Sequence, residues 1–248
     1  MLGRVAIGDL HGVPAMSLPL KPLALAAALV LAVGCDRADS AEGAAAVDAD
    51  AAVATETAPA ADADATAGEV AAPQLQAAMR ELWRGHIVHA RDYAMAVHAG
   101  DSAAADAAAD AVVENARQIA DAVGGFYGDA GGERMMTLLA GHWGAVKALT
   151  DARADGDEAA ATAAMNDLTA NAGEIAVFLA GANPNLPEDA VRGMLLAHGA
   201  HHAQQVGLIM KGDTAGEAES WTAMQAHMDM IADALADAIA KQFPDKAA

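Results

Sequence analysis

Histidine recurs in this chain at a fixed interval. His86, His142 and His198 are separated by 142 − 86 = 56 and 198 − 142 = 56 residues, and imidazole is a good ligand for Zn, Cu, Ni and Fe. His202 follows His198 at i+4, a spacing that places both rings on one helix face, where they could chelate a single ion. The pattern therefore predicts a transition-metal site, and His227 is a further candidate ligand.

The residues between these histidines keep the same interval. Asn115, Asn171 and His227 follow one another with 171 − 115 = 56 and 227 − 171 = 56. Each interval also contains a glycine followed by an aspartate, namely Gly100-Asp101, Gly156-Asp157 and Gly212-Asp213. Glycine suits the position after a helix, and aspartate suits the N-cap of the next. The fold that this pattern predicts is all-α, a six-helix antiparallel bundle built from three helical hairpin repeats.

The spacing within each hairpin predicts a polar layer. His86 lies 100 − 86 = 14 residues before its glycine and Asn115 lies 115 − 100 = 15 residues after it. Because a helix rises by about 1.5 Å per residue, the two side chains should face each other across the hairpin. The layer would contain six residues from the three hairpins, namely His86, Asn115, His142, Asn171, His198 and His227.

A buried polar layer is costly unless each group is paired or coordinated, and two structural interpretations meet that need. In the first, the histidines bind a metal ion, while Asn115, Asn171 and Glu174 orient the rings from behind. In the second, hydrogen bonds within the layer fix the register of the helices in a structural or interaction protein.

A metal-dependent enzyme of hydrolase or transferase type is a further alternative that uses the same histidines. Such an enzyme needs an open coordination position and a general base, and Glu174 is the best-placed acidic candidate. His142, His198 and His202 are similar to the three ligands of four-helix metalloproteins of the damage-inducible and thiol-transferase type, which use an His-x-x-x-His pair. The catalytic residues stay unassigned.

The first 72 residues have a different character. Residues 16–34 contain a short apolar run that is typical of a signal peptide rather than a membrane span. The run ends at Cys35, the only cysteine, in a context that resembles the lipobox of bacterial lipoproteins. Residues 35–72 are rich in alanine and acidic residues and predict a flexible tether, whereas residues 1–15 are interpreted as an upstream mis-start or a non-functional leader.

These features predict a cell-envelope lipoprotein that is anchored to the membrane through Cys35 and faces the periplasm, with inner and outer membrane both open. The domain itself would span residues 73–248. The formal net charge is −20, and no basic cluster interrupts it, which argues against nucleic acid as a partner. Hydrophobic residues make up 54% of the chain and aromatic ones only 3%. Most of the apolar content is alanine, which favours helix.

Several motifs resemble a family of small prokaryotic all-helical proteins for which no activity is established. In addition to the repeated histidines and asparagines, five stretches carry the resemblance, namely Leu82-Trp83 before His86, Phe126-Tyr127-Gly128-Asp129, Glu174-Ile175-Ala176 with Phe178-Leu179, Asn183-Pro184-Asn185, and the terminal Gln242-Phe243-Pro244-Asp245-Lys246. The resemblance covers most of residues 75–246 and implies a helical fold, but it transfers no function.

Overall fold

The computed structural model describes residues 72–247, and every regular element in that range is a helix. The elements are α1 (Pro73–Ala99), α2 (Ser102–Tyr127), α3 (Asp129–Asp155), α4 (Glu158–Ala182), α5 (Glu188–Lys211), α6 (Thr214–Gln242) and α7 (Pro244–Ala247). The predicted all-α class is confirmed for this part of the chain. The four-residue α7 was not predicted, because a single turn carries no apolar period from which to recognise it.

The turns after α1, α3 and α5 have the predicted chemistry. Gly100, Gly156 and Gly212 adopt left-handed conformations, with φ of 69°, 71° and 68°. The aspartate that follows each glycine caps the next helix, since the side chain of Asp101 accepts a hydrogen bond from the backbone N–H of Ala104 at 3.0 Å. Asp157 and Asp213 cap α4 and α6 in the same way. Three tight connections therefore hold successive helices side by side.

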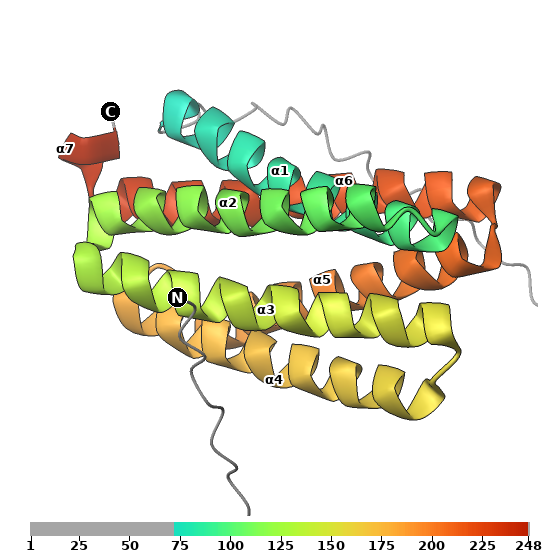
Figure 1. The fold of residues 1–248 in the computed structure, drawn as a ribbon. Helices are drawn as coiled ribbons and strands as arrows, with labels where there is room; N and C mark the ends of the chain where they lie inside the picture. Colours follow the sequence, from blue (N-terminus) through green and yellow to red (C-terminus); the bar gives the residue numbers. More distant parts are fainter. Residues whose placement is uncertain (1–71, 248) are drawn as a thin grey trace, which may run out of the picture. The chain divides into compact units, whose positions relative to one another are not determined.

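The long helices lie side by side in a bundle (Figure 1). α1, α3 and α5 contact one another, while α2 and α4 lie against their sequence neighbours and α6 returns to α1. The largest cluster of buried apolar side chains contains Ile87, Leu138 and Met228, each at most 2% exposed. The result is a helical bundle in which the helices that carry His86, His142 and His198 meet.

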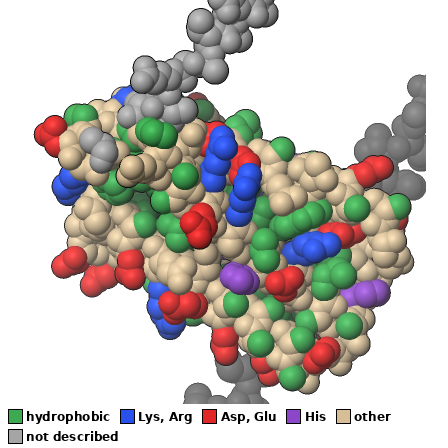
Figure 2. Space-filling model, turned by 90° about the horizontal axis from the view of Figure 1, so that it is seen from above, with side chains coloured by type: hydrophobic (Ala, Val, Ile, Leu, Met, Phe, Trp, Pro, Cys, Tyr) green, Lys and Arg blue, Asp and Glu red, His purple; other side chains and the backbone are tan. Residues whose placement is uncertain are grey.

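Ion pairs join the first long helix to the last. Arg80 donates two hydrogen bonds to Asp233, at 2.6 and 2.5 Å, and Arg84 forms the same type of pair with Asp229. On the face of the molecule that Figure 2 shows, acidic, basic and apolar side chains are intermixed. The two ion pairs hold α1 against α6.

The predictions for the N-terminal segment fall outside the described residues. They are the leader at 1–15, the signal peptide at 16–34, the lipidation of Cys35 and the tether up to residue 71. The predicted domain begins at Pro73, which is also the first residue of α1. Among the helices that the structure describes, none combines the length and the hydropathy that a membrane crossing needs.

Candidate metal centre

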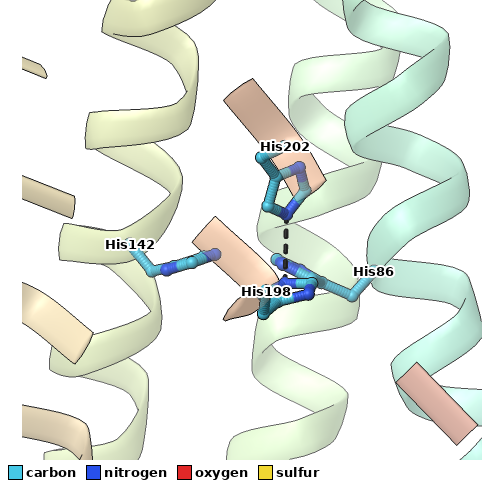
Figure 3. A group of neighbouring side chains, drawn as sticks. All are labelled: His86, His142, His198 and His202. Carbon is cyan, nitrogen blue, oxygen red and sulfur yellow. Dashed lines mark hydrogen bonds between the residues drawn. The ribbon is translucent and has the colours of Figure 1, made fainter. Parts of the chain in front are cut away.

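Four histidines converge at the centre of the bundle. His86 is on α1, His142 on α3, and His198 and His202 on α5, and all four are buried, with 2 to 6% of their surface exposed. One ring nitrogen from each lies within 4.8 Å of the corresponding nitrogen of every other. Figure 3 shows the rings of His86, His142 and His198 pointing toward one another, with His202 directed at them from one side. The four histidines are close enough to hold one metal ion.

The separations fit first-row metal coordination after small adjustments. Zn–N bonds of about 2.0–2.1 Å place neighbouring ligand nitrogens of a tetrahedral site about 3.3 Å apart. The Nε2 atoms of His198 and His202 are already 3.1 Å apart. His86 and His142 approach from other helices, and one ring nitrogen of each lies within 4.8 Å of the corresponding nitrogens of the others, so these nitrogens would need to move closer by at most about 1.5 Å.

Most of the ring nitrogens lack any hydrogen-bond partner. Both nitrogens of His86, both of His142 and Nδ1 of His198 are buried without one. A buried polar atom left without a partner costs about 1–3 kcal/mol. Among the four rings, the His198–His202 contact is the one hydrogen bond that joins two of them.

The interior keeps these imidazoles neutral, which is the form that binds metals. Burial, together with the neighbouring His142 and His89, lowers the pKa of His86 to about 3. Burial also lowers the pKa of His142 to about 4, although Asn171 acts in the opposite direction. The pKa values of His198 and His202 lie well below the usual value, first because of burial and then because of the other histidines. Lone pairs are thus available at neutral pH.

Asn115 and Asn171 lie behind the layer in equivalent positions. The amide of Asn115 donates to the backbone carbonyl of Leu82 at 3.0 Å, and that of Asn171 donates to Leu138 at 3.0 Å. Each asparagine is 33 residues from the carbonyl it binds, and each keeps a buried Oδ1 atom without a partner. The Nδ2 atom of each amide is thus held by a backbone carbonyl, and its Oδ1 atom is left to accept a hydrogen bond. An acceptor held in this way can orient the N–H group of a histidine ring.

His227 occupies the third of these positions and does not belong to the four-histidine group. Its Nε2 lies 2.9 Å from the carbonyl of Met194, again 33 residues away. Its ring stacks on His198 with centroids 6.3 Å apart. His227 was predicted to be a ligand, whereas in the structure it has the position that asparagine has in the other two hairpins, and its Nε2 bonds to a carbonyl of α5.

Glu174 is also placed elsewhere than expected. Its side chain is 60% exposed and forms an ion pair with Arg134 at 3.3 Å. Although it lies one turn from Asn171, its carboxylate turns outward, since burying an unpaired charge would be costly. It neither orients a histidine nor stands where a general base would be needed.

Two glycines beside the ligands were missed. Gly85 and Gly141 precede His86 and His142, and a Cβ atom there would lie 2.8 Å and 3.0 Å from the amide nitrogens of Asn115 and Asn171. In the third hairpin, where His227 replaces asparagine, the residue before His198 is Ala197. The pairing of Gly-His with Asn in two repeats, and of Ala-His with His in the third, was a signal that could have identified these glycines.

The chain was compared with models of protein families, with curated proteins and with solved structures, and no match was found in any of the three.

Proposed function

We propose that this domain binds one transition-metal ion, Zn, Cu, Ni or Fe, through His86, His142, His198 and His202. The observation that carries the proposal is the convergence of four neutral imidazoles whose nitrogens are mostly without partners. Coordination would satisfy one nitrogen on each ring. The other nitrogen, which carries the proton, would be free to donate a hydrogen bond to a neighbour. Asn115 and Asn171 would accept from the rings of His86 and His142.

The bundle that holds this site is, in the same proposal, three copies of one helical hairpin. Support comes from features that recur once per copy: the left-handed glycine, the capping aspartate, and the side chain that binds a carbonyl 33 residues earlier. Each copy contributes one histidine at the same level, and the third adds His202. The pseudo-symmetry would explain how one ion can be surrounded from three helices.

The biological role that suits such a site is storage, sensing or protection at the cell envelope, with Cys35 as the lipid anchor. An enzymatic role has less support, since Glu174, the expected base, lies at the surface. Substitution of Cys35 by alanine tests the anchor, because it should move the protein from the membrane fraction to the soluble fraction of the envelope.

The test of the site is the metal content of the full chain, purified without a metal-binding tag and compared with the His142→Ala/His198→Ala double mutant. The expected result is one ion per chain in the wild type and none in a double mutant that keeps its helical circular dichroism. His98→Ala is the matched control, because His98 lies on α1 and is exposed. A folded wild type that stays metal-free after incubation with each of the four ions would refute the proposal.

Thermal unfolding gives a second readout. A ligand that binds only the folded state stabilises it by about 2.7 kcal/mol when its free concentration is about 100 times the dissociation constant. For a domain of this size, that corresponds to a rise in Tm of about 5–10 °C. The rise should be absent in the double mutant and present in His98→Ala.

A further inference from the structure

A small cavity lies on one side of the histidine layer. Its volume is about 30 Å³, and its walls include His86, His142 and His198, together with Trp83, Leu139 and Leu195. About 10–15 Å³ is enough to hold one water molecule. The cavity therefore has room for a small inorganic ligand but not for an organic substrate.

The cavity and His202 lie on opposite faces of the layer. Trp83, Leu139 and Leu195 each come three residues before the histidine on their helix, one turn toward its N-terminus, whereas His202 comes four residues after His198. His202 is not among the residues that line the cavity. Figure 3 shows its ring on one side of the other three. An ion in the layer would thus have His202 above it and the cavity below.

Charge adds an independent argument. The four ligands are neutral, so a divalent ion would bring two uncompensated positive charges into the interior, which is unfavourable. Within residues 72–247 the buried acidic residue is Glu217, and its carboxylate is already paired with Arg91 at 2.7 and 2.8 Å. An anion from solution would reduce this charge.

We infer that the metal bound by the four histidines keeps a coordination position open opposite His202, and that this position takes one small inorganic anion, such as hydroxide or azide, in the cavity. The inference rests on the proposed metal binding and adds what the ion can do. His86, His142 and His198 surround the ion, His202 blocks one face, and the apolar residues around the cavity exclude bulk water from the other. Larger anions are rejected by size.

The experiment uses the full chain loaded with Co(II), whose visible absorption responds to coordination number, and azide as the probe. The expected result is a saturable spectral change with one azide per cobalt. Leu195→Phe, which adds volume at a partly exposed position of the cavity wall, should weaken azide binding by at least about tenfold while cobalt stays bound.

A second variant works in the opposite direction in case the first fails to fold. Leu139→Ala enlarges the cavity and should admit thiocyanate. Its matched control is Leu149→Ala, since Leu149 is on the same helix, is equally buried, and packs in a separate apolar cluster. The control should bind azide as the wild type does and should not gain thiocyanate.

The outcomes separate the two proposals. Absence of bound cobalt would overturn the metal site and this inference with it. Bound cobalt whose spectrum does not respond to azide would overturn the inference alone, as would azide binding that neither cavity variant alters.

Discussion

The Nε2 atoms of His198 and His202 lie 3.1 Å apart on successive turns of α5. No charged group separates them, and burial together with the neighbouring histidines holds both pKa values well below the usual value. Two imidazoles in this arrangement share one proton or bind one cation. Acid should therefore lower the stability of the metal-free protein.

Stability of the metal-free protein should fall steeply with acid. Folded-state pKa values of about 3 for His86 and about 4 for His142 lie below the unfolded value of 6.5, so below that pH the unfolded chain binds protons that the folded chain does not. Each such histidine lowers the free energy of unfolding by about 1.4 kcal/mol per pH unit. Above about pH 7, these groups contribute no pH dependence.

Urea unfolding of the full chain between about pH 7 and about pH 5 would measure this dependence. With four such histidines the steepest slope is about 5 kcal/mol per pH unit, and His86→Leu should reduce it by about one quarter. His98→Ala should leave it unchanged, because His98 is exposed. A free energy that is flat across this range would contradict the prediction.

His227→Asn, made together with Ala197→Gly, should retain the metal. Asparagine is the residue that the other two hairpins place at this position, each beside a glycine, and with that glycine in place it can donate to the carbonyl of Met194 as His227 does now. The measurement is metal content and affinity beside His198→Asn, which removes a member of the four-histidine group and should abolish binding. Loss of the ion in the Ala197→Gly/His227→Asn variant, with Ala197→Gly alone still loaded, would show that His227 is a ligand.

Gly85→Ala should destabilise the domain although alanine is the better helix former. The new Cβ would lie 2.8 Å from the amide nitrogen of Asn115 and push it from the carbonyl of Leu82, so the usual gain of about 1 kcal/mol would be reversed. Gly144→Ala, with open space around its Cβ, should show that gain in full. Denaturant unfolding of the two variants compares them, and equal stabilisation would contradict the argument.

Glu217→Ala should cost about 1–3 kcal/mol of unfolding free energy. Its carboxylate is 8% exposed, accepts two hydrogen bonds from Arg91 and a third from Gln205, and holds α1, α5 and α6 together. Glu114→Ala is the control, since Glu114 pairs with Arg117 where both side chains are 59% exposed, and it should change stability by less than about 0.5 kcal/mol. Equal effects of the two substitutions on chemical unfolding would disprove a special role for Glu217.

Local signals in the sequence predicted the turns and the meeting of His86, His142 and His198. Gly100 and Asp101 act within a few residues of each other, so their roles follow from backbone preference and capping alone. The convergence of His86 and His142 was predictable because equal distances from a turn place residues at equal heights. The all-α class followed from the same reasoning.

The remaining details depend on how each helix is rotated. His202 and His227 both stood near the layer in the sequence, but only packing decided that His202 points inward while His227 bonds to α5. Glu174 was misplaced because residues one turn apart share a helix face, yet a long charged side chain at the edge of that face reaches solvent. Gly85 and Gly141 keep the repeat interval, 141 − 85 = 56, but they were missed because the interval alone does not show that an asparagine side chain of the next helix lies against each of them.

The burial of the histidines also has a consequence for rates. With His86 and His202 each 2% exposed, an ion at the centre has no direct path to solvent, and it can leave only when α1, α3 and α5 move apart. Exchange of the bound ion would then be limited by transient opening of the bundle rather than by its affinity for imidazole. Such a protein would keep its ion through brief changes in the surrounding medium and would release it at the rate at which the helices move apart.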